Sequence, residues 1–154
     1  MKAILIVMMV LVAGPSYGGR VKPKVVNLSM EEVLAKTLYL EAANQSTEGK
    51  VAVAAVIWNR AGGKASEMKR VVLAPKQFSC WNRRSPASVR IKDDWSYRIC
   101  QIIAREMVSG EFKMPSGLEV ATHYHEKSVK PSWGRAQHLL VKIGDHLFYR
   151  VVEP

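Results

Sequence analysis

The stretch from Ser29 to Arg60 constrains this chain more than any other, because it holds two helical patterns joined by a short polar connection. Ser29 and Glu32 have the Ser-x-x-Glu spacing of a capping box, which predicts that the first helix starts there. The second pattern starts at Ser46 or Thr47, has a face of small residues, and ends at the pair Gly62-Gly63. The sequence therefore predicts a helical hairpin.

Glu41 is the strongest candidate for a catalytic residue in this stretch. It follows Leu34 and Leu38 at i+7 and i+3, so a helix carries all three on one face and the carboxyl lies at the end of an apolar stripe. Burial disfavours the charged form of a carboxyl, so we expect Glu41 to hold its proton towards neutral pH, as a general acid that breaks a glycosidic bond must. Periodicity alone equally allows a helix-end glutamate satisfied by local amides.

The first eighteen residues have the pattern of a signal peptide. Lys2 precedes an apolar run from Ala3 to Ala13, and small residues then lead to Gly18, where we expect cleavage. The run is too short to span a bilayer comfortably, although an uncleaved anchor is the alternative. We predict a signal peptide at 1–18, a basic arm at 19–28, and one domain at 29–154, because 154 residues with 48% hydrophobic content form one ordinary core. A secreted or periplasmic location follows.

The charge of the chain predicts an acidic partner. Loss of residues 1–18 removes only Lys2 among the charged groups, so the formal net charge falls from +10 to +9. Anionic cell-wall polymers, lipid head groups and nucleic acid are candidates, and export favours the first. We expect a monomer with no nucleic-acid partner and no stable membrane insertion. Cys80 and Cys100 form an even pair for which an oxidising compartment allows a disulfide, while the sequence leaves their geometry open.

The rest of the chain predicts an α+β fold in which helix predominates. A third helix is expected from Ser66 to Leu73, and a fourth runs from a cap at Asp93 or Asp94 to Gly110. The irregular segment from Lys76 to Ile91 is either the lining of a cleft or a plain surface connection. From Leu118 to His125 apolar and polar residues alternate, and residues 139–143 and 146–152 flank the turn Gly144-Asp145, so we expect a small C-terminal antiparallel sheet.

Three segments carry a resemblance to a known family: Leu34 to Arg60, the triplet Gln77-Phe78-Ser79, and the tail ATHYHEKSVKPSW followed by IGDHLFYR. In this order they resemble the SleB/CwlJ-type cell wall hydrolases, the family of spore-cortex-lytic enzymes and related phage or bacterial peptidoglycan hydrolases. The resemblance implies a helical core like that of lysozyme and the lytic transglycosylases. It also implies cleavage between N-acetylmuramic acid and N-acetylglucosamine, with no cofactor and with Glu41 as the catalytic glutamate.

One departure from the family pattern bears on mechanism. The family usually continues Glu-Ala-Arg-Gly-Glu, whereas here Glu41 is followed by Ala-Ala-Asn and then Gln45, so the second acid is an amide; Leu40 also stands where glycine is common. We favour the interpretation that the residue at position 45 only orients Glu41 by hydrogen bonding, which the amide of Gln45 can do. A single acid and base suits a lytic transglycosylase, while hydrolytic glycosidases commonly need two carboxyls. For a water-using route the remaining candidate partners are Glu48, Asp93, Asp94, Glu119 and Glu126.

Aromatic rings present apolar faces to sugar rings, and amide, hydroxyl and imidazole groups bond to acetamido groups. On the resemblance and these chemistries, the candidate substrate-binding residues are Tyr39, Gln45, Gln77, Phe78, Ser79, His123, Tyr124, His125 and Trp133, with Trp81 as a further candidate for the cleft wall. We expect Asn59 and Arg60 to be structural.

The rival interpretation is a zinc-dependent amidase or peptidase. His123 and His125 share one face of the predicted strand, and His138 or Glu126 would complete a site. The chain lacks a compact His-Glu-x-x-His motif, so we favour histidines that are hydrogen-bonded beside a carbohydrate cleft, with no metal. A non-enzymatic basic binding module is the third class.

Overall fold

The computed structural model describes residues 28–92, 94–131 and 137–151. The predicted signal peptide, most of the basic arm, Asp93 and Trp133 lie outside these ranges. The four helices are α1 (Met30–Ala42), α2 (Thr47–Arg60), α3 (Ala65–Leu73) and α4 (Trp95–Ser109), with short 3-10 turns η1 (Ser79–Trp81) and η2 (Pro86–Ser88). The strands are β1 (His123–Glu126), β2 (Gln137–Ile143) and β3 (His146–Val151). The predicted helix-predominant α+β class is confirmed for this part of the chain.

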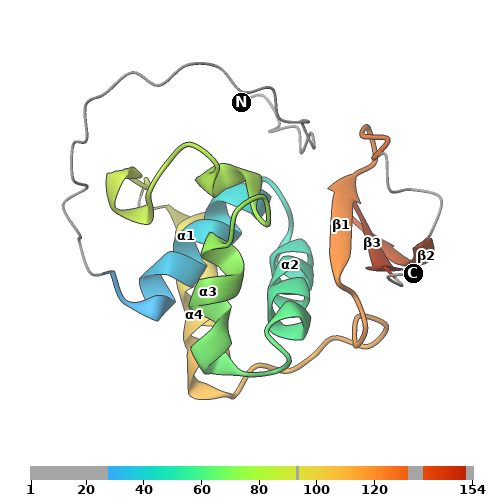
Figure 1. Ribbon diagram of the computed structural model, residues 1–154, viewed down its shortest axis with the longest axis horizontal. Coiled ribbons are helices and arrows are strands. Elements are labelled where there is room, and N and C mark those ends of the chain that lie inside the picture. Colours follow the sequence, from blue (N-terminus) through green and yellow to red (C-terminus); the bar gives the residue numbers. More distant parts are fainter. Residues whose placement is uncertain (1–27, 93, 132–136, 152–154) are drawn as a thin grey trace.

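Helix α2 is the central element of the fold (Figure 1). It packs against α1, α3 and α4 on one side and contacts β1 and β2 on the other. Every residue from Ala52 to Ile57 has an exposed fraction of 0%, so α2 is buried around its whole circumference. Three of these six residues are alanines, and small side chains let neighbouring helices approach closely. The sheet is thus held against the helices through α2.

The helix ends follow their sequence signals. The Ser29 amide donates to Glu32 Oε2 at 3.0 Å and the Glu32 amide donates to Ser29 Oγ at 3.1 Å, which is the predicted capping box. Asp94 caps α4, and Gly110 ends that helix with φ +80°. Helix α3 begins at Ala65, one residue earlier than predicted, without a side-chain cap.

The sheet has the strand order β1-β3-β2 with antiparallel pairs, and the predicted hairpin turn at Gly144-Asp145 is confirmed. The alternation that starts at Leu118 was expected to form one strand, but β1 starts only at His123. The side-chain amide of Asn59 on α2 donates to the carbonyls of Leu118 and Ala121, both at 2.8 Å. These carbonyls pair with a helix side chain, so this segment is held as a turn against α2 instead of joining the sheet.

Gln45 fastens the hairpin to the helices. Its Oε1 accepts a hydrogen bond from the Asp145 amide at 3.1 Å, and its Nε2 donates to Asn44 Oδ1 at 3.2 Å. Lys50 donates to the carbonyls of Gln45 and Ala43, and these hydrogen bonds stabilise the conformation of the junction between α1 and α2. One amide side chain therefore sets how the β2–β3 turn lies on the α1–α2 junction.

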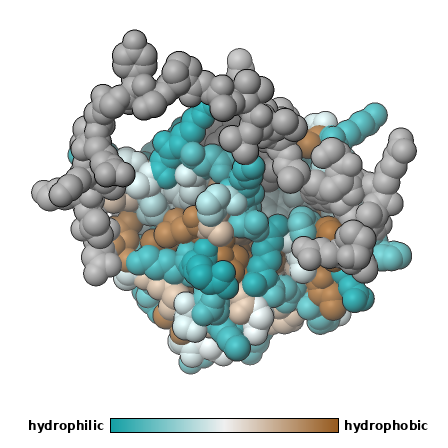
Figure 2. Space-filling model, in the orientation of Figure 1, coloured by the Kyte–Doolittle hydropathy of each residue, from teal (hydrophilic) through white to brown (hydrophobic). Residues whose placement is uncertain are grey.

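Cys80 in η1 and Cys100 in α4 are buried free thiols, so the disulfide that export would allow is not formed in the structure. Burial raises the pKa of Cys80 far above its ordinary value and raises the pKa of Cys100 to about 12, which keeps both thiols protonated at neutral pH. None of the described helices is both long and apolar enough to cross a membrane. On the face in Figure 2, hydrophilic side chains cover most of the described surface and hydrophobic residues show between them in separate patches.

Candidate active site

Glu41 lies where three segments far apart in the sequence meet. It is half-buried in the last turn of α1, beyond Leu34 and Leu38, which are both 0% exposed. Its Oε2 accepts a hydrogen bond from Tyr124 Oη on β1 at 2.8 Å. Its Oε1 accepts from the Cys80 amide in η1 at 3.4 Å. The predicted position of a carboxyl at the end of an apolar stripe is therefore found in the structure.

Tyr124 is the main partner of Glu41, and it is buried, with 7% of its surface exposed. Its ring stacks on Phe148 with centroids 5.7 Å apart and meets the ring of His146 edge-on at 5.1 Å. Burial, with the charge of Glu41 as the next cause, holds the pKa of Tyr124 well above its usual range. The phenol keeps its proton, so it is the donor in the bond to Glu41.

Arg60, at the end of α2, connects the segment before β1 with the segment before η1, next to Glu41. Its Nε donates to the Thr122 carbonyl at 2.6 Å, and its Nη1 donates to the Gln77 carbonyl at 3.3 Å and to Gln77 Oε1 at 3.2 Å. Its guanidinium lies 5.3 Å from the centroid of the Phe78 ring, a cation–π distance. Burial lowers the pKa of Arg60, while the charges of Tyr124 and Glu41 raise it. The expected structural role of Arg60 thus includes a charge that acts on Glu41.

Within the Gln77-Phe78-Ser79 triplet, Phe78 is 1% exposed, so its ring packs beneath the Arg60 guanidinium and cannot stack on a sugar. Gln77 is exposed and Ser79 is half-buried, so both remain accessible to a ligand. Trp81 donates from its indole nitrogen to Thr37 Oγ1 at 3.0 Å. This segment lines the site through its backbone and its polar groups.

Tyr39 and Gln45 have structural partners. The Tyr39 hydroxyl donates to Asp94 Oδ2 at 2.8 Å, and this bond is the main cause that raises the pKa of Tyr39. The side-chain hydrogen bonds of Gln45 go to Asn44 and to the Asp145 amide, and within the described residues none reaches Glu41. An orienting hydrogen bond from Gln45 to the catalytic candidate, which we favoured from the sequence, is therefore not present.

The two histidines of β1 have different surroundings. Both ring nitrogens of His125 are engaged, Nδ1 with the Glu126 carbonyl at 2.7 Å and Nε2 with the Tyr149 hydroxyl at 3.0 Å. His123 Nδ1 lies 3.0 Å from Thr122 Oγ1, and burial, then the charge of Arg60, lower the pKa of His123 to about 4. A metal would have to displace the hydrogen bonds of His125, and the described residues contain no cluster of three or more metal-ligating side chains.

Two contributors to the site escaped the sequence analysis. The Cys80 amide is a backbone donor, and because every residue except proline has a backbone N–H, the sequence does not show which one reaches Glu41. His146 is 3% exposed beside Tyr124, and its Nδ1 has no hydrogen-bond partner among the described residues. His146 lies within the IGDHLFYR tail, directly after the Gly144-Asp145 turn, and this position in a family-like segment could have marked it as a candidate site residue.

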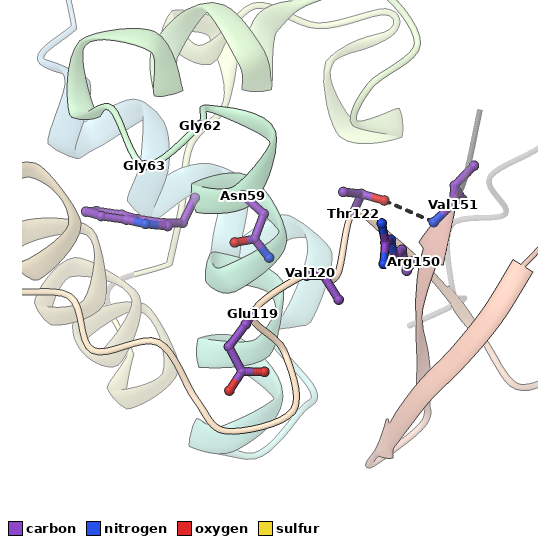
Figure 3. Close-up of a pocket in the computed structure, with 9 residues that line it drawn as sticks. Asn59, Gly62, Gly63, Glu119, Val120, Thr122, Arg150 and Val151 are labelled. Atoms are coloured by element: carbon purple, nitrogen blue, oxygen red, sulfur yellow. Dashed lines mark hydrogen bonds between the residues drawn. The ribbon is translucent and has the colours of Figure 1, made fainter. Parts of the chain in front are cut away.

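Two cavities flank Thr122. The smaller, of about 340 Å³, lies between the end of α2 and the sheet, and Figure 3 shows Asn59, Glu119 and Arg150 around it. The larger, of about 510 Å³, is lined by Arg60, Arg70, Gln77 and His123 among others. Thr122 and Val151, joined by the hydrogen bond drawn in Figure 3, belong to both cavities.

Comparison with known structures defines the class of fold. The chain is similar to the crystal structure of the catalytic domain of the Bacillus cereus SleB protein, with a TM-score of 0.57 and 24% sequence identity over 86% of this chain and 100% of that one. At this identity the likeness shows a shared fold. No curated protein matches the chain.

The family comparison is more specific. The cell wall hydrolase family matches residues 44–149, and the chain belongs to this family. Membership makes the protein a cell wall hydrolase and supports peptidoglycan as its substrate, as the resemblance implied. The matched range includes β1 and the Gln77-Phe78-Ser79 triplet but starts after Glu41.

Proposed function

We propose that this protein is a lytic transglycosylase that cleaves the bond between N-acetylmuramic acid and N-acetylglucosamine, with Glu41 as its acid and base. The observation that carries the proposal is the placement of Glu41: a half-buried carboxyl at the convergence of α1, η1 and β1, held on one oxygen by the buried hydroxyl of Tyr124. A group fixed in this way is pre-positioned for proton transfer.

The two oxygens of Glu41 have different tasks in this proposal. Oε2 is held by the 2.8 Å bond from Tyr124, whereas Oε1 has only the 3.4 Å contact with the Cys80 amide, which is beyond the usual range for such bonds. Oε1 is therefore the oxygen that exchanges a proton with the substrate. In the acid step, protonated Glu41 gives its proton to the bridging oxygen as the bond from that oxygen to the anomeric carbon breaks.

The base step returns the proton. The carboxylate of Glu41 takes the proton of the muramic acid 6-hydroxyl, and that oxygen bonds to the anomeric carbon. The product is a 1,6-anhydromuramic end, water is not consumed, and Glu41 is protonated again.

The surroundings of Glu41 support a route with one carboxyl. In the described residues, Tyr124 and the Cys80 amide donate hydrogen bonds to Glu41. Glu41 is also the carboxylate whose charge raises the pKa values of Tyr124 and Cys80, and no second carboxylate contributes to either shift. Asp94 is engaged as the cap of α4, and Glu119 lines the cavity of Figure 3. A hydrolytic route would need a second carboxyl beside the bond.

The test is Glu41→Gln, which keeps the shape of the side chain but removes the transferable proton. We expect cleavage of purified peptidoglycan to fall by about a hundred- to ten-thousand-fold, with an unchanged circular dichroism spectrum. Glu106→Gln, the same change at an exposed position of α4, is the matched control and should retain activity. Gln45→Glu should also have a much smaller effect than Glu41→Gln.

Product analysis separates the mechanisms. Mass spectrometry should find 1,6-anhydromuramic ends, whereas reducing muramic ends would identify a water-using muramidase. We expect EDTA to leave activity unchanged; activity lost in EDTA and restored by zinc would favour the amidase. Near-normal lysis by Glu41→Gln would refute the assignment of this glutamate.

We further propose that the protein acts as a monomer in the cell envelope after export. The export part of this proposal rests on the pattern of residues 1–18, which lie outside the described part of the chain. Mature protein recovered from the periplasm or medium should begin near Gly19, and an intact Met1 in that material would contradict the signal peptide.

A further inference from the structure

We propose that the larger cavity, lined by Arg60 and Arg70, binds a carboxylate of the peptide stem that the muramic acid carries. This inference rests on the proposed function, because it assumes that a glycan strand lies across Glu41. It adds a recognition site for the anionic part of that strand.

The larger cavity lies next to Glu41. Gln77 lines the cavity, and three residues further along the same segment the Cys80 amide contacts Glu41. On the other wall, His123 lines the cavity and its neighbour Tyr124 bonds to Glu41. Three extended residues span at most about 10 Å, so the cavity and the carboxyl lie within reach of one substrate.

The described lining of the cavity is positively charged. Arg60 and Arg70 bring two guanidinium groups to the cavity, and its described lining contains no aspartate or glutamate. The low pKa of His123 leaves its imidazole neutral at neutral pH, so it neither adds to nor opposes this charge. A cavity of about 510 Å³ with this lining favours an anionic group of a few heavy atoms.

Arg60 and Arg70 each keep hydrogen-bond donors for a ligand. Arg60 uses Nε and Nη1 for Thr122 and Gln77, while its Nη2 has no partner among the described residues. Arg70 uses Nε in its ion pair with Glu67 at 2.7 Å, which leaves its terminal nitrogens available. Guanidinium groups bind carboxylates well because their paired N–H groups match the two oxygens. In a stem-bearing strand the lactyl carboxyl of each muramic acid is amide-bonded to its stem, so the free carboxylates of the strand belong to the peptide stems.

The experiment compares two substrates: glycan strands that carry peptide stems, and the same strands after carbodiimide coupling with ammonia has converted the stem carboxylates to amides. The stems are kept in both, because their removal would free the lactyl carboxylate of the muramic acid. Arg70 is the residue to change, because its side chain is 73% exposed and Arg60 is tied into the fold. Arg70→Gln should raise KM on the strands with free stem carboxylates about tenfold with little change in kcat, and should leave KM on the amidated strands unchanged. Arg70→Lys should restore part of the affinity, because it keeps the charge.

Arg105→Gln is the matched control, since this arginine on α4 is 70% exposed and lies outside the cavity. An equal rise of KM in Arg105→Gln would show that only net charge matters and would overturn the proposal. The proposal is also overturned if Arg70→Gln affects both substrates equally or neither. A wild-type KM that rises when phosphate-bearing wall polymers are removed, and does not rise when the stem carboxylates are amidated, would assign the cavity to phosphate and overturn the proposal.

Failure of the proposed function looks different. If Glu41→Gln keeps activity on both substrates, or if the products show cleaved amide bonds, the glycosidase assignment fails whatever Arg70 does. If Glu41→Gln is inactive on both substrates and Arg70→Gln is normal on both, only the stem-binding inference fails.

Discussion

At the scale of single residues, the proposed mechanism depends on the hydrogen bond from Tyr124 to Glu41. The phenol is buried and keeps its proton, so it always presents a donor to Oε2. A hydrogen bond to a charged group contributes about 1.5–3 kcal/mol, which is enough to fix one carboxylate orientation. We therefore propose Tyr124 as a positioning residue for Glu41, and its ring packs against Phe148 independently of the hydroxyl.

Tyr124→Phe tests this role, because it removes the donor and keeps the ring. We expect kcat on peptidoglycan to fall by about ten- to a hundredfold, which is the fold-change that the loss of about 1.4–2.8 kcal/mol produces. The matched control is Tyr39→Phe, which removes a hydroxyl that bonds to Asp94 instead. It should lower the free energy of unfolding and leave kcat unchanged. Equal losses of kcat in the two variants would show that Tyr124 acts only through stability.

At the scale of elements, the contact between the β2–β3 turn and the α1–α2 junction positions the sheet. The turn residue Gly144 has φ +58°, and a Cβ there would lie 2.5 Å from Gln45 Oε1. Two constraints therefore act on Gly144: the backbone conformation and the approach of Gln45. Because β1 pairs with β3, this contact also sets where Tyr124 lies.

Gly144→Ala and Gly110→Ala separate these constraints. Both glycines have positive φ, but nothing lies within 4 Å of a Cβ at Gly110. The left-handed conformation alone costs an alanine about 1–2 kcal/mol, so we expect that loss for Gly110→Ala and a larger loss for Gly144→Ala in urea unfolding. In a Gln45→Ala background the difference between the two should shrink, as a double-mutant cycle would show. Equal losses in the wild-type background would contradict the close approach.

At the scale of the whole molecule, the half-buried His123 and the buried His146 are expected to make the fold sensitive to acid. Burial, helped by the charge of Arg60, lowers the pKa of His123 from an ordinary value near 6.5 to about 4, and burial also lowers the pKa of His146. Between these pH values the unfolded chain binds more protons than the folded chain, so stability rises with pH. The contribution is complete above about pH 6.5 and is lost as the pH falls towards 4.

We therefore expect the free energy of unfolding to fall as the pH is lowered from about 6.5 to about 4, as measured by urea titrations at several pH values. His123→Gln should flatten this slope, since glutamine does not titrate. His138→Gln is the matched control, because His138 is exposed on β2, and it should leave the slope as in the wild type. A wild-type stability that does not change across this range would contradict the prediction.

Local patterns determined much of this fold from the sequence alone. The capping box at Ser29, the glycines that end α2 and α4, and the turn at Gly144-Asp145 act through neighbours in the chain, and all were found where predicted. Glu41 was predicted because a helical period is local too. The family followed from short segments in a fixed order, each of which is a local signal.

Only the tertiary structure decided which partners these residues have. Tyr124 and Glu41 are 83 residues apart, and Gln45 and Asp145 are 100 apart, so no periodicity relates them. The turn at Leu118 replaced a predicted strand because Asn59, 59 positions earlier, satisfies its carbonyls. Hydrogen bonds and burial depend on distance in space, and packing around α2 brings these groups together. The sequence determined which chemical groups are available, and packing determined which of them meet.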